Sequence, residues 1–175
     1  MGGFLIHARD IKTLTKFENV TQTLYDHENG RPFLEISYSK VEKKYPKFKF
    51  LKFGLPKFVI HGLKANLNLS IYDHDQVLSR LAHFEKKNAL QFVYATNAIF
   101  NFNQSNQENI ILKADVVKFS NQGDFISESS SLITPKGEEF YKLLKLNFEE
   151  GKPSYSIREK PGETPVLNIF YKDLN

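Results

Sequence analysis

The chain has 175 residues, of which 41% are hydrophobic and 25% are charged, and it contains no cysteine. This length fits one domain with a core of normal size, and the composition excludes collagen, intrinsic disorder and a coiled coil. Without cysteine there are no disulfides, thiolate nucleophiles or zinc–cysteine sites. A net charge of +4 is too small to indicate nucleic acid on its own.

Alternation of apolar and polar residues is the dominant pattern along the chain. It is found at residues 34–38, 47–53, 63–71, 92–102 and 110–119. Alternation with a period of two predicts strands that have one side on a core and the other in solvent. The abundance of Phe, Tyr, Ile, Val and Thr agrees with this, because these residues suit a pleated, half-buried surface.

Turn signals separate the predicted strands. Residues 26–30 favour a hairpin, because Asn29-Gly30 tolerates positive φ, and further breaks occur at residues 103–109, 121–124, 135–137 and 160–163. Short strands with regular turns indicate an antiparallel jelly roll, sandwich or barrel. We therefore predict an all-β fold of about seven to ten strands with at most one or two short helices.

The domain boundaries follow from the extent of these strands. We expect an N-terminal extension at residues 1–16, one β domain at 17–160 and a C-terminal tail at 161–175. Residues 76–85 fit a short helix and a strand equally well. The spacing at 138–150 also fits both, and we favour a strand. No apolar run is long enough to span a bilayer, so we expect either a cytosolic chain or one whose leader or anchor is absent.

No catalytic motif is present. The serine run at residues 127–131 lacks a nucleophile-elbow frame, and we interpret it as a polar strand edge or loop. Asp73-His74-Asp75 with His83 has no metal-binding spacing, and we interpret it as a polar turn. His61, beside Gly62, is interpreted as structural. We therefore expect no enzyme activity, no cofactor and no metal.

Lysines and aromatic residues alternate between Lys40 and Lys57. Such a segment is typical of an edge strand protected by lysines, but it also suits an anionic amphiphile, or single-stranded nucleic acid through ring stacking. In a strand, Lys47 and Phe48 point to opposite sides, which argues against stacking. We therefore expect no nucleic-acid partner.

Two alanine-led stretches, at residues 95–102 and 112–119, resemble one another and precede glycine turns. Residues 17–148 resemble the OstA-like periplasmic proteins of lipopolysaccharide export. The resemblance is carried by residues 20–26 before Gly30, by residues 113–119 before Gly123, and by Gly137 before a further strand. The LptC family of bridge proteins is the most similar form. The absence of a preceding membrane anchor and the segment from Lys160 onward depart from this pattern.

The resemblance implies a twisted, open-ended β-sandwich whose apolar groove receives lipid acyl chains, and edge strands that pair with other export-bridge proteins. It implies a periplasmic or secreted protein that binds and transfers an amphiphilic lipid without catalysis, and that is membrane-associated only through an anchor outside this chain. The expected apolar lining is Leu67, Leu69, Ile71, Phe92, Tyr94, Phe100 and Phe102. The expected contacts to anionic groups are Lys43, Lys44 and Lys47.

Two alternatives remain open at this point. The length, strand number and possible helix at residues 138–150 also resemble the lipocalin-like (calycin) barrels, which bind small apolar ligands. The Gly-x-Trp signature of that family is absent, because the chain has no Trp. A third possibility is a structural or interaction domain whose interior is filled by its own 16 Phe and 8 Tyr.

Overall fold

The structure of the protein is a computed structural model that describes residues 18–25, 30–45, 47–48, 51–52, 57–69, 93–103, 109–119, 125–150 and 154–171. Within these residues the chain forms twelve strands and no α-helix, which confirms the all-β expectation. The strands are β1 (Glu18–Tyr25), β2 (Pro32–Lys44), β3 (Lys47–Phe48), β4 (Leu51–Lys52), β5 (Lys57–His61), β6 (Lys64–Asn68), β7 (Val93–Asn103), β8 (Asn109–Phe119), β9 (Phe125–Thr134), β10 (Gly137–Glu150), β11 (Ser154–Arg158) and β12 (Val166–Tyr171).

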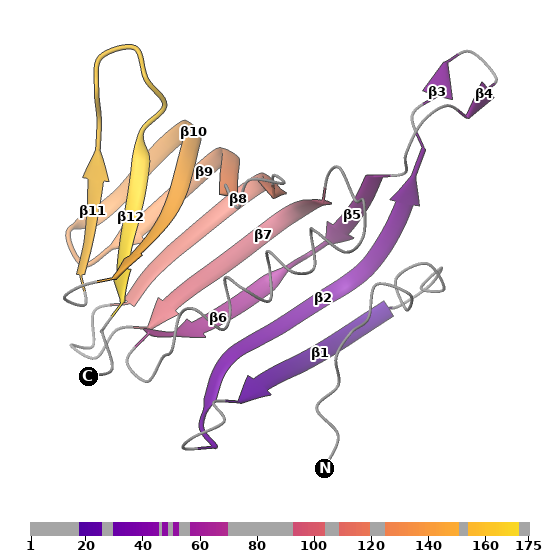
Figure 1. Ribbon diagram of the computed structural model, residues 1–175, viewed down its shortest axis with the longest axis horizontal. Helices are drawn as coiled ribbons and strands as arrows, with labels where there is room; N and C mark the ends of the chain where they lie inside the picture. The colour runs from indigo at the N-terminus through magenta and orange to yellow at the C-terminus, as the bar shows by residue number, and fades with distance from the viewer. Residues whose placement is uncertain are drawn as a thin grey trace.

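Ten of these strands form one curved sheet (Figure 1), in the order β1-β2-β5-β7-β8-β9-β10-β12-β11. β6 continues the line of β5 and pairs with β2 and β7. Most neighbours are antiparallel, as expected, but β5–β7, β6–β7 and β10–β12 are parallel. The sheet is therefore mixed, and its described strands follow an open path that ends at β1 and β11.

Several predicted local features are confirmed. β1 and β2 pair antiparallel across the Asn29-Gly30 signal, and Gly30 has a φ of 66° that a glycine adopts without strain. Residues 138–150 are in strand β10. The turn at residues 160–163 is closed by the Glu163 N–H, which donates to the Lys160 carbonyl at 3.0 Å. The uncertain segment at residues 76–85 lies outside the described residues.

Two segments differ from expectation. Residues 47–53 were expected to form one strand, but β3 and β4 pair with each other as a short hairpin beyond the end of β2 (Figure 1). β12 lies within the expected C-terminal tail, yet it pairs with β10 and β11 inside the sheet. The buried Asn168 side chain helps to fix β12, because its Oδ1 accepts from Asn147 at 3.2 Å and from Arg158 at 3.0 Å.

Along each strand, side chains alternate between the two faces of the sheet. This alternation shifts by one residue at positions that lie opposite each other in neighbouring strands. In β7, Ala95 and Ala98 are both buried, so Thr96 and Asn97 both lie on the opposite face. The register between β7 and β8 is nevertheless the same before and after this point. Each strand therefore carries its extra residue at the same level, and the sheet bends as a unit there.

We call the row of residues at this bend the fold line. It consists of Asn19, Ser39, Gly62, Asn97, Asp115, Ser129 and Lys142. The row includes four positive φ angles: 56° at Asn19, 63° at Gly62, 51° at Asn97 and 50° at Ser129. Left-handed backbone in a strand interrupts the ladder and turns the chain. Repeated in neighbouring strands, it bends the whole sheet.

Small side chains line the inside of this bend. They are Ala95, Ala98, Ala114, Val117, Ser127 and Ser130, all of them buried. The Oγ atoms of Ser127 and Ser130 are 3.1 Å apart, whereas the Cα atoms of residues three apart in an extended strand are separated by about 10 Å. The strand is thus sharply bent between them. The alanine-led echo in the sequence marks two neighbouring strands that cross the same line.

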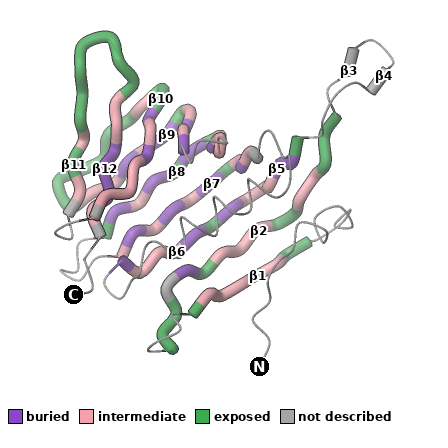
Figure 2. The backbone as a smooth tube through the Cα atoms, in the orientation of Figure 1, coloured by how far each residue is buried: buried purple, intermediate pink, exposed green. Residues whose placement is uncertain are grey.

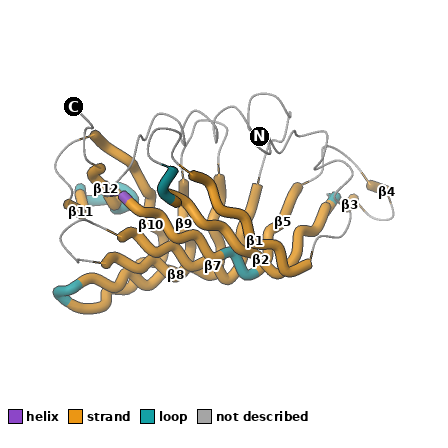
Figure 3. Tube along the Cα trace, turned by 90° about the horizontal axis from the view of Figure 1, so that it is seen from below, coloured by secondary structure: helices purple, strands orange, loops and turns teal. Residues whose placement is uncertain are grey.

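The hydrophobic core lies on the face toward which the sheet bends, here called the inner face. Buried residues gather in the central strands (Figure 2), and the curvature of the sheet is seen in Figure 3. Its most deeply buried side chains include Leu69, Phe102, Ile110, Leu112, Leu132 and Ile169. The opposite, outer face carries polar contacts such as that between the Asn101 amide and Asn66 Oδ1, at 2.5 Å. One apolar and one polar face explain the alternation in the sequence.

Candidate functional site

Four of the expected apolar lining residues lie together on the inner face. Leu67 is the Cα partner of both Leu34 and Phe102, so these three side chains form one row across β2, β6 and β7. Phe100 and Leu69 belong to the same buried cluster. Sequence alternation therefore grouped these residues on the face where the structure places them.

Tyr94 lies on the outer face, apart from Phe100 and Phe102. The sequence pattern placed these three residues on one side, because it assumed unbroken alternation from residue 92 to residue 102. The fold line passes through Asn97 and shifts the alternation, so Tyr94 faces away from the core. Its ring lies 5.2 Å from Lys57 Nζ. Ile71 and Phe92 lie outside the described residues.

Phenylalanine rings from several strands meet across the inner face. Phe102 in β7 and Phe148 in β10 have ring centroids 6.1 Å apart, although these strands are three positions apart, roughly 14 Å in a flat sheet. Phe148 also contacts Phe125 at 5.8 Å, and Phe125 contacts Phe119 at 5.1 Å. The curvature of the sheet creates this cluster, so the sequence pattern gave no reason to single out its last three members.

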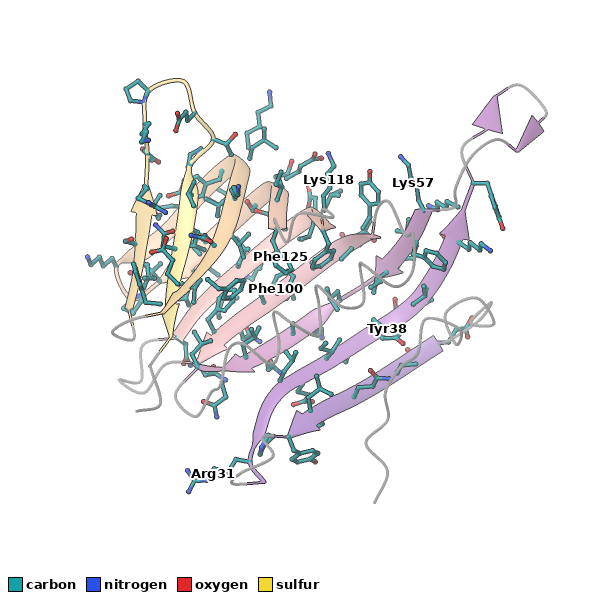
Figure 4. All side chains as sticks on the ribbon, viewed as in Figure 1. Arg31, Tyr38, Lys57, Phe100, Lys118 and Phe125 are labelled. Carbon is teal, nitrogen blue, oxygen red and sulfur yellow. The ribbon has the colours of Figure 1, made fainter. Side chains whose placement is uncertain are left out.

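One cross-strand row on the inner face runs from aromatic rings to a lysine. The Cα partners follow one another from Phe125 to Phe119, Val93, Phe58 and Lys43. Phe58 and Phe125 are buried, Phe119 is half-buried, and Lys43 is exposed. Figure 4 shows Phe125 between Phe100 and the end of the sheet at which Lys57 and Lys118 lie. We call this set the ring row.

The three expected anion-contacting lysines have different surroundings. Lys43 Nζ lies 5.1 Å from the centre of the Tyr45 ring. Lys44 forms an ion pair with Glu42 at 3.3 Å. Lys47 is in the β3–β4 hairpin, and its side chain lies outside the described part of the structure. Of the two lysines whose side chains are described, Lys43 lies at the end of the ring row and Lys44 does not.

A hydrogen-bonded cluster on the outer face was missed by sequence reasoning, which assigned His61 a structural role only. Glu42 Oε2 lies 3.0 Å from His61 Nε2, and His61 Nδ1 lies 2.9 Å from Thr96 Oγ1. Hydrogen bonds from Lys40, His61 and Lys44 to Glu42 lower the pKa of this carboxyl from 4.5 to about 2. The cluster ties β2, β5 and β7 together beside the fold line.

This cluster has the acid–imidazole–hydroxyl order of a nucleophilic triad. A triad also needs hydrogen-bond donors directed at the developing oxyanion. With His61 Nε2 donating to Glu42, Nδ1 accepts from the Thr96 hydroxyl. Thr96 lies inside the sheet, paired with His61 on one side and Val116 on the other, so the backbone N–H groups around it take part in strand pairing rather than pointing at an oxyanion. We therefore interpret the cluster as a structural tie.

The serine run lies inside the sheet rather than at an edge. β9 pairs with β8 and β10 on its two sides. Ser127 and Ser130 are buried on the inner face, and the Ser127 hydroxyl donates to the Leu144 carbonyl at 3.2 Å. The expectation of a strand edge or loop is wrong, because small polar residues are needed inside the bend.

Comparison with protein-family models and with curated proteins finds no match. Among the residues that the structure describes, no three His, Asp or Glu side chains converge as a metal site. Asp73-His74-Asp75 and His83 lie outside those residues. No described helix has the length and apolar character needed to cross a bilayer.

Proposed function

We propose that the protein binds and transfers an amphiphilic lipid without catalysis, holding an acyl chain on the inner face and its anionic headgroup at Lys43. The observation that carries this proposal is the ring row, which runs from Phe125 through Phe119 and Phe58 to an exposed cation. An apolar lane that ends in one charge matches the chemistry of an ionised lipid. The resemblance to lipopolysaccharide-export proteins implies the same ligand class and a periplasmic or secreted location.

The burial of the inner face limits where such a chain would lie. Phe102 is fully buried among other core side chains, so the middle of the face is occupied by the protein itself. Phe119 and Phe148 are half-buried and pack against this core. The margin near Phe119 and Lys43 is therefore the part of the inner face that supports lipid binding best.

The ends of the strand order support the expected partners. β1 and β11 each pair with one neighbour in the described sheet. Edge strands can extend a sheet by pairing with a strand of another protein. We therefore propose, as the resemblance implies, that these edges pair with other export-bridge proteins. The open strand order gives less support to a lipocalin-like barrel.

Calorimetric titration with lipopolysaccharide, oleate and an uncharged monoacylglycerol tests the proposal. All three ligands are expected to bind, and Lys43→Gln is expected to weaken the two anionic ones roughly tenfold, as for the loss of a charged hydrogen bond. The same variant should leave the monoacylglycerol unchanged. Lys113→Gln, an exposed lysine in β8, is the matched control and should change nothing.

Failure of all three ligands to bind would refute the proposal. Equal losses for Lys43→Gln and Lys113→Gln would refute the headgroup position, because the effect would then reflect net charge. Phe119→Ala, with outer-face Ile111→Ala as its control, tests the apolar part of the site. Only the first should weaken the monoacylglycerol.

A further inference from the structure

Strand β10 has two neighbours along only part of its length. β9 pairs with it from Gly137 to Leu146, whereas β12 pairs with it only from Lys145 to Glu150. Among the described strands, none pairs with residues 137–142 on the side away from β9. This part of β10 is therefore a third sheet edge, separate from those at β1 and β11, and we call it the β10 edge.

The backbone groups of the β10 edge are oriented for pairing with another strand. The Gly137 carbonyl accepts from the Thr134 hydroxyl at 3.3 Å, and the Tyr141 carbonyl accepts from the Ser130 hydroxyl at 3.5 Å. Both carbonyls therefore point toward β9. Because the N–H and C=O groups of successive residues in a strand point to alternate sides, those of residues 138 and 140 point away from β9. A row of such groups is a template for a further strand.

The side chains of the β10 edge combine one exposed ring with two opposite charges. Phe140 is 78% exposed, the highest value among the large hydrophobic side chains that the structure describes. Tyr141 packs against the core on the inner face, so alternation places Phe140 and Glu138 on the outer face. Lys142 lies on the outer face as well, because the strand returns to the core only at Leu144. Both charged side chains are exposed.

Two copies of this edge complement each other when they pair antiparallel about Phe140. Glu138 and Lys142 are each two residues from Phe140, so Glu138 of each copy then lies opposite Lys142 of the other, and the two Phe140 side chains face each other. Aromatic pairs and opposite charges across strands both stabilise a sheet. A register centred on Glu138, whose backbone also points outward, would place two glutamates face to face. Charge and backbone direction therefore select the twofold axis at Phe140.

We propose that the protein forms a homodimer in which the β10 edges of two copies pair antiparallel about Phe140. Charges on a sheet edge usually prevent such pairing, because copies of one strand bring like charges together. Here the twofold arrangement brings unlike charges together, which favours a second copy as the occupant. A single short strand pair is a small interface, so the dimer is expected to be weak. It uses neither Lys43 nor the ring row, so dimerisation and lipid binding can fail separately.

Sedimentation velocity of the full chain over a concentration series tests the dimer. The wild type is expected to pass from monomer to dimer as its concentration rises. Lys142→Glu and Glu138→Lys should each weaken dimerisation about tenfold, because the two attractive charge pairs of the dimer become repulsive. Mixing these two variants should restore the dimer, because both charge pairs are of opposite sign in the heterodimer. Phe140→Thr should weaken the dimer without changing the unfolding midpoint in urea, since this ring is exposed.

Lys64→Glu makes the same charge change at an exposed position in β6 and should dimerise as the wild type does. Lys43→Gln, which tests the proposed lipid site, should also dimerise normally. A wild type that stays monomeric at every concentration would overturn the proposal. So would a dimer that Lys142→Glu does not weaken, which would use another edge, or a loss that mixing the two charge variants does not reverse.

Discussion

The inner and outer sides of the fold line obey different physical requirements, although they are one or two residues apart. Inside the bend, Ala98, Ala114 and Ser130 are buried side by side. Outside it, Asn97 and Ser129 are exposed and have positive φ. The inside limits side-chain volume, because bending brings the flanking residues together. The outside limits backbone conformation and leaves side-chain size free.

Polar contacts reinforce the outer side in the strands nearest the N-terminus. The Ser39 hydroxyl donates to the His61 carbonyl at 2.8 Å, and the His61 ring contacts Glu42 and Thr96. A Cβ on Gly62 would meet Ser39 Oγ at 3.2 Å, with φ already at +63°. We therefore expect two kinds of substitution to destabilise the fold: larger side chains on the inner side of the fold line, and residues that disfavour positive φ on its outer side. Loss of a polar contact on the outer side should have a smaller effect.

The largest effect is expected from added volume inside the bend. Ala114→Leu should lower the free energy of unfolding by about 1–3 kcal/mol, the usual cost of overpacking a tight core. Urea unfolding followed by circular dichroism measures it. Lys113→Leu, one position away on the exposed face, should be close to neutral. Equal tolerance of the two changes would show that the inside of the bend is not tightly packed.

A backbone change on the outer side is expected to come next. Ser129 has a φ of 50°, so Ser129→Val should destabilise the protein by about 1–2 kcal/mol, because a β-branched residue is strained in the left-handed region. Ser129→Gly, its control, should be neutral or stabilising. If thermal unfolding ranked valine above glycine, the positive φ at this position would be wrong.

Loss of a hydrogen bond inside the bend should cost less. Ser127→Ala removes the bond to the Leu144 carbonyl and the contact with Ser130, and should cost about 0.5–1.5 kcal/mol. Ser131→Ala is the matched control, because its partner Glu138 is exposed and can bond to water instead. Equal stabilities of the two variants in urea would contradict the role of Ser127 in the bend.

The smallest effect is expected at the outer-face cluster. Because the pKa of Glu42 falls from 4.5 to about 2 on folding, its contribution to stability is complete above about pH 4.5 and is lost as pH falls toward 2. NMR titration of the carboxyl should show the low pKa in the wild type and a higher one in Lys40→Gln. A midpoint near 4.5 in the wild type would contradict the hydrogen bonds. Glu42→Gln should remove this part of the acid dependence.

Local patterns were reliable wherever a feature depends on residues close together in the chain. The Asn29-Gly30 hairpin is one example, and the strand at residues 138–150 is another. The pattern was wrong for Tyr94, because one extra residue at Asn97 places the preceding side chains of β7 on the opposite face from the one that unbroken alternation predicts. It also missed Phe125 and Phe148 as partners of the core rings, since they meet only through curvature.

The residues themselves establish that this chain forms strands, where many of its turns lie, and that each strand has one apolar side. These properties depend on alternation and on turn residues, which are local. The curved sheet decides which residues change face and where β12 inserts. Those outcomes depend on pairing between distant segments, because a bend can persist only when neighbouring strands turn at the same level.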